Sequence, residues 1–378
     1  MAEAKHISEL NIITYRGIRN LEIDDLGRVN ILLGDNNSGK TSVLEAIQIL
    51  CNPCEYNLLQ VAKQRDKYRS FPIRRGLNTY ESFLYLFDNS KQTENPKNLE
   101  FSVSGIVNGC KQIVTVAGEI SKRLVDSKDP DLKSLFHDKA EQTLIENHIE
   151  IPEFVGEISA TYIGNRQQCL FPNTKNKIEV SQVSRIHSST REKPIVNVKS
   201  LQVIDHIIDN SLEEIIKKPQ IKEQAVLLLR EFDEDITDIR YINNEGSFFP
   251  VVERNHSEYL PLSMYGDGMK KALSMANAIL SCKSGVVLID EFETALHTSS
   301  MSKVFKFVIA VSKEFNVQLF LTTHSLEAVD KLLNCSDEDI DSIRVIRLKK
   351  KDTETLGKVT TGSEALEERN AYNLELRV

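Results

Sequence analysis

The chain has 378 residues, of which 40% are hydrophobic and 27% charged, and its net charge is −8. This length suggests two or three structural units, and the composition is that of an ordinary globular protein. The negative charge argues against attraction of the whole molecule to nucleic acid, although a local basic patch could still bind it. The sequence has no apolar run of about 18 residues and no signal-peptide core. We therefore expect no membrane contact and a cytoplasmic location.

The N-terminal region predicts a strand, a turn and a second strand. Residues favourable to β-structure occupy 6–15 and 21–23. Residues 29–33 (VNILL) form a short apolar run, which is typical of a buried parallel strand. After Thr41 the pattern changes to that of a helix, since apolar residues recur on one helical face. Those residues are Val43, Leu44, Ile47 and Leu50.

The middle of the chain is less regular. Residues 99–107 and 112–116 predict strands. Residues 121–148 are polar and charged but carry leucines at helical spacing, so we expect a helical insertion there. Residues 181–199 show little periodicity and predict a loop.

The C-terminal part alternates between helices and apolar strands, which favours a parallel α/β sheet. We expect helices at 220–232, 270–280, 303–315 and 326–333, and strands at 239–242, 248–252, 285–289, 317–322 and 343–348.

Residues 34–41 (GDNNSGKT) match the pattern G-x-x-x-x-G-K-[ST] between the predicted buried strand and the predicted helix. Glycines let successive N–H groups point inward, and these donors with the helix N-terminus form a cradle for phosphate. Lys40 adds a positive charge between the terminal phosphates, and Thr41 offers a hydroxyl ligand to Mg²⁺. The predicted phosphate-binding residues are Gly34, Asn36, Asn37, Ser38, Gly39, Lys40, Thr41 and Ser42.

Acidic and imidazole side chains follow two later apolar strands. Asp290 and Glu291 end the run at 286–289, and ligand sites in open α/β sheets lie at such carboxyl ends. Asp290 can hold Mg²⁺ through water, and Glu291 is placed to orient or deprotonate the water that attacks the γ-phosphate. His324 follows the next apolar strand and is expected to contact the γ-phosphate. The predicted catalytic residues are therefore Glu291, His324 and Lys40, and the predicted metal ligands are Thr41 and Asp290.

The order of these motifs resembles that of ABC-type ATPases of the SMC, RecF-like and OLD-like group. Residues 263–271 (SMYGDGMKK) resemble the signature motif of this group and differ from the L-S-G-G-Q of transport cassettes. Residues 290–297 (DEFETALH) resemble the D-E-x-E-x-x-L-H of the OLD-like branch. The turn at 15–18 (YRGI) resembles that group's first strand turn and adds Arg16 to the expected nucleotide-binding residues.

The resemblance implies an ABC-type P-loop NTPase of the α/β class with a central mixed or parallel sheet, an N-terminal antiparallel β segment and a helical insertion. We expect an N-terminal ATPase lobe at 1–118, the insertion and loop at 119–200 and a C-terminal lobe at 201–378. ATP and Mg²⁺ are the implied cofactors. ATP would lie between two copies in a homodimer or higher homo-oligomer, where Ser263, Gly266 and Gly268 of one copy complete the P-loop of the other.

The resemblance also suggests a role. Similar ATPase subunits occur in PARIS- and Septu-type antiviral systems, and after His324 the chain shows no Toprim nuclease set. We therefore expect an ATP-driven sensor or scaffold for a separate effector, such as a nuclease, in antiviral defence. A RecF- or SMC-like DNA repair ATPase is the alternative.

Three smaller features remain open. The basic segment 63–75 could contact DNA or be a solvated surface. Gln167 and Gln168 are candidates for the family's Q-loop glutamine. The six cysteines are expected to be thiols rather than a zinc site, because no second C-x-x-C follows Cys51 and Cys54.

Overall fold

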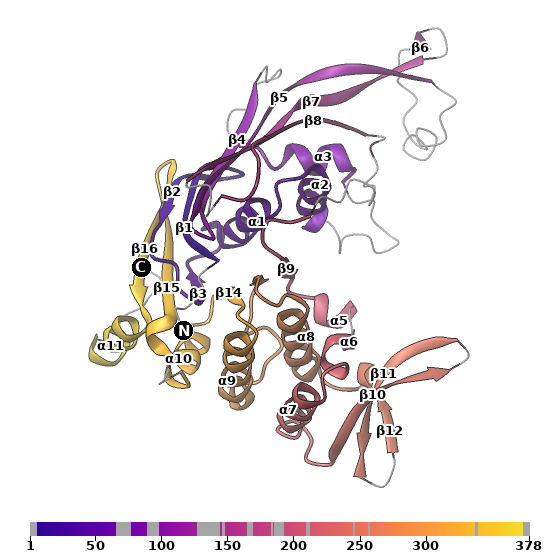
Figure 1. Cartoon of the computed structure of the whole chain (residues 1–378), viewed down its shortest axis with the longest axis vertical. Coiled ribbons are helices and arrows are strands. Elements are labelled where there is room, and N and C mark those ends of the chain that lie inside the picture. Colours follow the sequence, from indigo (N-terminus) through magenta and orange to yellow (C-terminus); the bar gives the residue numbers. More distant parts are fainter. Residues whose placement is uncertain are drawn as a thin grey trace. The chain divides into compact units, whose positions relative to one another are not determined.

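The computed structural model describes residues 6–65, 77–88, 98–126, 144–145, 148–164, 169–182, 184, 193–208, 212–244, 246–255, 258–336 and 339–372. Its contacts divide the chain into two compact units (Figure 1). Unit 1 contains Met1–Glu9, Ile23–Leu44 and Val196–Val378, and unit 2 contains Leu10–Glu22 and Glu45–Ile195. Across the described ranges, no helix is long and apolar enough to cross a membrane.

Unit 1 is built on a six-stranded sheet in the order β16-β15-β3-β14-β13-β9. The five strands from β15 to β9 are parallel, and β16 pairs antiparallel with β15. The central strands β3, β13 and β14 are buried at every residue, which explains why apolar residues dominate them without alternating with polar ones. The strands are β3 (Val29–Leu33), β9 (Val198–Leu201), β13 (Val286–Ile289), β14 (Gln318–Thr322), β15 (Ile343–Lys351) and β16 (Glu354–Thr361).

The helices of unit 1 bury apolar faces in the main core, where α8, α9 and α10 contribute most of the helical residues. Two single 3₁₀ turns also occur, η4 (Leu262–Met264) and η5 (Ile340–Ser342). The helices are α5 (Asp205–Ile208), α6 (Glu213–Ile216), α7 (Pro219–Leu229), α8 (Asp267–Ser281), α9 (Thr298–Glu314), α10 (Leu326–Asn334) and α11 (Gly362–Tyr372). A separate antiparallel sheet contains β10 (Ile236–Asn244), β11 (Ser247–Arg254) and β12 (Glu258–Pro261).

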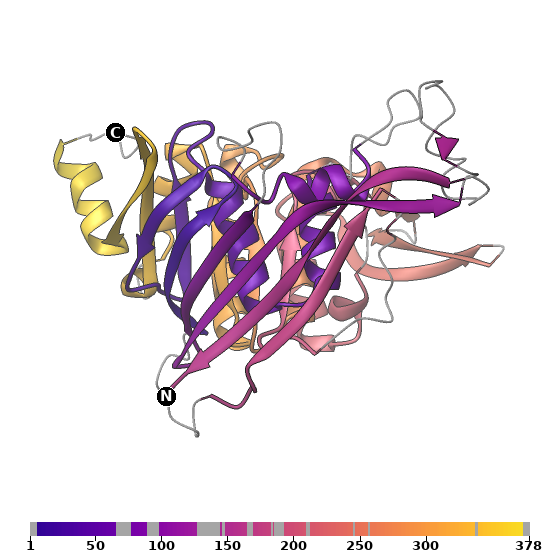
Figure 2. The same cartoon turned by 90° about the horizontal axis from the view of Figure 1, so that it is seen from above.

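Unit 2 is dominated by a seven-stranded sheet in which β2-β1-β4-β5-β7-β6 are neighbours and β8 pairs with β7. Figure 2 shows the long strands of this sheet running side by side. The aromatic rings of Tyr15, Phe83, Phe87, Phe101 and Phe154 pack edge to face or tilted in its core. The strands are β1 (Ile7–Tyr15), β2 (Ile18–Ile23), β4 (Leu99–Val107), β5 (Cys110–Asp126), β6 (Leu144–Ile145), β7 (His148–Ile163) and β8 (Thr174–Ser181).

In the part of unit 2 that the structure describes, three helices lie wholly or partly within the unit. They are α1 (Lys40–Cys51), α2 (Glu55–Gln64) and α3 (Thr79–Leu84). The dividing line between the units falls within α1, after Leu44. Asn78 and Glu81 form a capping box at the start of α3, which satisfies free N–H groups of its first turn.

The helical insertion expected at 121–148 is wrong where the structure describes it. Residues up to Asp126 continue β5, and β7 begins at His148. These two strands pair without interruption from Lys111–Ile163 to Asp126–His148. The long-range pairing decides the structure there, and local leucine spacing cannot reveal it. Residues 127–143 lie outside the described ranges. The expected boundary after residue 118 falls inside β5.

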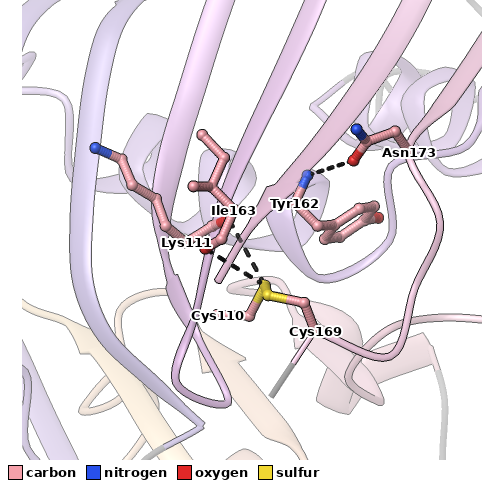
Figure 3. Close-up of a disulfide and its surroundings, with 6 residues drawn as sticks. All are labelled: Cys110, Lys111, Tyr162, Ile163, Cys169 and Asn173. Atoms are coloured by element: carbon pink, nitrogen blue, oxygen red, sulfur yellow. Dashed lines mark hydrogen bonds between the residues drawn. A yellow bond between two sulfur atoms is a disulfide. The ribbon is translucent and has the colours of Figure 1, made fainter. Parts of the chain in front are cut away.

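A disulfide joins Cys110, at the start of β5, to Cys169, beyond the end of β7 (Figure 3). Beside it, the side-chain oxygen of Asn173 accepts a hydrogen bond from the N–H of Tyr162 at 2.8 Å. The bridge closes a loop of 59 residues, for which the chain-entropy account gives about 4 kcal/mol of stabilisation. The expectation of six thiols is therefore corrected at these two positions. Cys51, Cys54, Cys282 and Cys335 take part in no disulfide among the described residues.

Candidate nucleotide site

The loop between β3 and α1 has the backbone that a phosphate cradle requires. Gly34 has φ +154°, and a Cβ there would lie 2.5 Å from the carbonyl oxygen of Leu348. Asn37 and Gly39 also have positive φ, which curls the chain so that successive N–H groups can converge. The side chains of Asn36 and Asn37 are exposed, whereas Ser38 is buried. In the part of the chain that the structure describes, the Ser38 hydroxyl has no hydrogen-bond partner.

Lys40 is the first residue of α1, and its side chain lies within this loop. Its ammonium donates to the carbonyl oxygens of Gly34 at 2.7 Å and Asp35 at 3.0 Å. Burial lowers the pKa of Lys40, and nearby carboxylates, Asp290 first among them, act in the opposite direction. Its Nζ also lies 3.4 Å from Nδ1 of His324. The structure thus brings together the lysine and the histidine that the sequence placed in separate motifs.

Asp290 emerges from β13 beside two hydroxyl groups. The Thr41 hydroxyl donates to its carboxylate at 3.1 and 3.2 Å. The Thr322 hydroxyl, at the end of β14, donates to Oδ1 at 2.5 Å. Parallel pairing of β13 and β14 brings their carboxyl ends together, and β3 pairs with the other edge of β14. Oxygen donors of this kind are those that Mg²⁺ prefers, so Thr41 and Asp290 fit the metal that the sequence predicted.

Glu291 is held by both its main chain and its side chain. Its φ is +45°, a conformation that non-glycine residues seldom adopt. Its N–H donates to the Thr322 hydroxyl at 2.8 Å, and its carboxylate accepts from the Thr294 hydroxyl at 3.2 Å. Sequence reasoning did not assign a role to Thr322. The available signal was its place at the end of β14, the strand beside β13.

Glu293 is a second residue that sequence reasoning left without a role. Its Oε1 accepts a hydrogen bond from the main-chain N–H of His324 at 3.2 Å. This contact joins the loop after β13 to the loop after β14. The position of His324 beside Lys40 is therefore supported by the loop that follows β13.

The turn that resembles the signature motif precedes α8. Ser263 and Gly266 are exposed, and Met264 is 76% exposed. No described atom would come within 4 Å of a Cβ at Gly266. Gly268 differs, because a Cβ there would lie 2.9 Å from the carbonyl oxygen of Ala295. The close approach of Ala295 is therefore enough to favour glycine at position 268, without any contact from a second copy of the chain.

Arg16, the remaining residue that the sequence predicted to bind nucleotide, belongs to unit 2. Its guanidinium pairs with Glu45 at 2.7 Å, and Arg65 pairs with the same carboxylate. The structure gives Arg16 this structural partner and leaves its contact with nucleotide a prediction. Gln167, Gln168 and residues 66–76 of the basic segment lie outside the described residues.

Comparison with known proteins identifies the reaction. A family model described as an AAA ATPase domain matches residues 6–155. A second, described as "AAA domain, putative AbiEii toxin, Type IV TA system", matches residues 165–330. A Helicobacter pylori protein named "ATP/GTP phosphatase" is 24% identical over 345 residues, covering 86% of this chain and 87% of that protein. The chain is an ATPase.

Two further similarities concern shorter stretches or the fold. An uncharacterized protein of Methanocaldococcus jannaschii is 34% identical over 113 residues, which is 30% of this ATPase and 98% of that protein. A solved structure of an Smc head bound to the C-winged helix domain of ScpA aligns with a TM-score of 0.50 at 12% identity. The alignment covers 96% of this ATPase and 100% of that chain. The likeness confirms the ABC-type P-loop NTPase fold.

Proposed function

We propose that the ATPase reaction takes place at the P-loop of unit 1, residues 34–41, and that Lys40, Glu291 and His324 act on the phosphates and the attacking water. Lys40 binds the β- and γ-phosphate oxygens. Glu291 orients the attacking water and accepts its proton, and His324 contacts the γ-phosphate. The products are ADP and inorganic phosphate.

The observation that carries this proposal is the double hydrogen bond of Thr322. Its hydroxyl accepts from the Glu291 N–H and donates to the Asp290 carboxylate. One side chain thus fixes both acidic residues relative to Thr41, the residue next to the phosphate-binding lysine. Fixed groups aimed at a reacting phosphate are what phosphoryl transfer requires, since its catalysis depends mainly on positioning and electrostatics.

The same residues provide for the metal and the phosphates. Thr41 and Asp290 would hold Mg²⁺, which would neutralise charge on the bound phosphates. The partnerless hydroxyl of Ser38 and the curled backbone of residues 34–39 supply further donors for phosphate oxygens. Among the described residues, the Lys40 ammonium lies within hydrogen-bond distance of two main-chain carbonyls and His324, and phosphate oxygens would replace these neighbours.

A second copy of the chain would complete the site. Ser263 and Gly266 are exposed at the start of α8, where a hydroxyl and a helix N-terminus can receive an anion. The P-loop of each copy binds one nucleotide, and we expect the turn at 263–268 to contact the γ-phosphate of the nucleotide bound by another copy. This arrangement gives a homodimer, or a higher homo-oligomer, with ATP between subunits.

The wider role we propose is that of an ATP-driven sensor or scaffold for a separate effector in antiviral defence. Support comes from the motif resemblance to OLD-like ATPase subunits. The family model matched at 165–330 also names a toxin of a toxin–antitoxin system, which is a two-component arrangement. A nuclease is the effector class that such ATPase subunits suggest.

Substitution of Lys40 by alanine tests the placement of the nucleotide. Loss of a buried charged contact to phosphate costs about 2–5 kcal/mol, so Lys40→Ala should weaken ATP binding by roughly 30-fold or more in calorimetry. Lys303→Met, which removes an exposed lysine paired with Glu231, is the control and should bind ATP as the wild type does. An unchanged affinity in Lys40→Ala would place the nucleotide elsewhere.

A further inference from the structure

Lys271, in the second turn of α8, is buried to an unusual degree for a lysine. Its relative exposure is 1%, and its Nζ has no hydrogen-bond partner among the described residues. A buried ammonium without a partner lowers stability, because its hydration is lost and nothing replaces it. Neither the phosphate cradle nor the exposed signature turn accounts for this side chain.

The surroundings of Lys271 are the acidic residues at the end of β13. Burial lowers its pKa, and the carboxylates of Glu293, Asp290, Asp205 and Glu291, in that order, act against this lowering. The buried ring of His206 is also within electrostatic range. Glu293 opposes this lowering most strongly, but it makes no direct ion pair with Lys271 in the described structure.

Glu293 has one oxygen engaged and one available. Oε1 accepts the main-chain N–H of His324, whereas Oε2 is buried and, within the described ranges, lacks a hydrogen-bond partner. Two complementary groups, an ammonium and a carboxylate oxygen, are therefore both buried and both unsatisfied in the same part of unit 1. A shift of α8 toward Glu293 would allow them to pair, with a gain from charge-assisted hydrogen bonding.

We propose that Lys271 is a positioning residue for ATP hydrolysis. Lys271 acts as the buried counter-charge of Glu293, and Glu293 in turn fixes the main chain of His324 beside Lys40. Gly266 is the N-cap of the same helix and Gly268 lies in its first turn, so Lys271 links the signature turn to the γ-phosphate end of the site. Contact between this turn and the nucleotide bound by another copy would change the position of His324 through Lys271 and Glu293. This role rests on the proposed contact of His324 with the nucleotide. The test of Lys271 must therefore give a result that differs from failure of the proposed nucleotide site.

Lys271→Met keeps most of the buried stem and removes the charge. We expect kcat to fall about tenfold or more, because small displacements of groups around a reacting phosphate slow the reaction strongly. ATP affinity by calorimetry should stay within about twofold of wild type. Tm should change little, because relief of the desolvation cost of the buried ammonium offsets loss of its attraction to the carboxylates. Lys303→Met is the control for loss of a lysine and should retain wild-type kcat.

The coupling to Glu293 is tested by combining Lys271→Met with Glu293→Gln. If Lys271 acts through Glu293, the double variant should lose little more kcat than Glu293→Gln alone. Multiplicative losses would overturn the proposal, as would wild-type kcat in Lys271→Met, or a fall in Tm and ATP affinity parallel to that in kcat.

If Lys271→Met does not fold, Glu293→Gln alone tests the proposal. It should lower kcat with ATP affinity retained, and wild-type kcat in it would also overturn the proposal. Failure of the proposed function is a different result, namely ATP affinity unaffected by Lys40→Ala.

Discussion

At the scale of single residues, the proposed catalytic end of the site depends on a threonine. Thr322 is fully buried and uses its hydroxyl twice, toward the Glu291 N–H and the Asp290 carboxylate. The left-handed conformation of Glu291 is one that persists only where the surroundings enforce it. The hydrogen bond from Glu291 to Thr322 is part of that enforcement.

Thr322→Val should therefore damage both folding and catalysis. The isosteric valine leaves the Glu291 N–H without its acceptor, which should lower the free energy of unfolding by about 1–3 kcal/mol. We expect kcat to fall about 10-fold to 100-fold, because Glu291 and Asp290 both lose a fixed partner. Steady-state phosphate release and thermal unfolding measure the two effects.

Thr323→Val is the matched control for Thr322→Val. Thr323 is equally buried, and its hydroxyl accepts only the Ser325 N–H among the hydrogen bonds described. It should lose stability but keep kcat near wild type. Equal losses of kcat in both variants would contradict the special role of Thr322.

At the scale of elements, the apolar runs of β3, β13 and β14 were predictable because strands buried on both faces need no alternation. The P-loop, Asp290, Glu291 and His324 follow such strands, so their convergence could be expected from a parallel sheet. The long ribbon of β5 and β7 could not be predicted from the sequence, because its pairing joins residues far apart in the chain. The disulfide of Cys110 and Cys169 depends on that same ribbon.

Buried polar contacts were also beyond sequence reasoning. Thr322 stands in a Thr-Thr-His-Ser stretch where either threonine could face the site. Lys271 follows Lys270, which instead pairs with Asp267. Adjacent residues on a helix point in different directions, and only the packed structure shows which of two lysines is buried beside the carboxylates.

The first turn of α8 permits a test of the interface between copies. A Cβ at Gly266 meets no described atom within 4 Å, and aspartate is a favourable N-cap, so Gly266→Asp should leave folding intact. It would place a negative charge where the other copy's γ-phosphate is proposed to lie. In a Glu291→Gln background, ATP should promote self-association in sedimentation, and Gly266→Asp should remove that effect.

Gly266→Asn, neutral and similar in size, separates charge from bulk and should retain more of the ATP-dependent association. Gly268 is less suitable for this test, because a side chain there would also press on the Ala295 carbonyl. ATP-dependent association that persists in Gly266→Asp would argue against the shared site.

At the scale of the whole molecule, the proposed effector is a separate protein. The purified chain should hydrolyse ATP but should not cut DNA in Mg²⁺ or Mn²⁺, because we propose that the nuclease activity belongs to the partner. DNA incubated with the chain alone, and with the product of a neighbouring gene added, would distinguish the two sources of cleavage. Cleavage that copurifies with the chain and disappears in a variant of the chain would contradict a separate effector.

The central claim is that this site binds ATP and that Glu291 positions the water for its hydrolysis. Glu291→Gln keeps the shape of the side chain and removes its basic oxygen. Measured on the same preparation, ATP affinity should be retained while phosphate release falls by about 10²-fold or more, the usual scale for a catalytic base. Glu314→Gln, an exposed substitution at the end of α9, should change neither quantity. Phosphate release near the wild-type rate in Glu291→Gln would contradict the account.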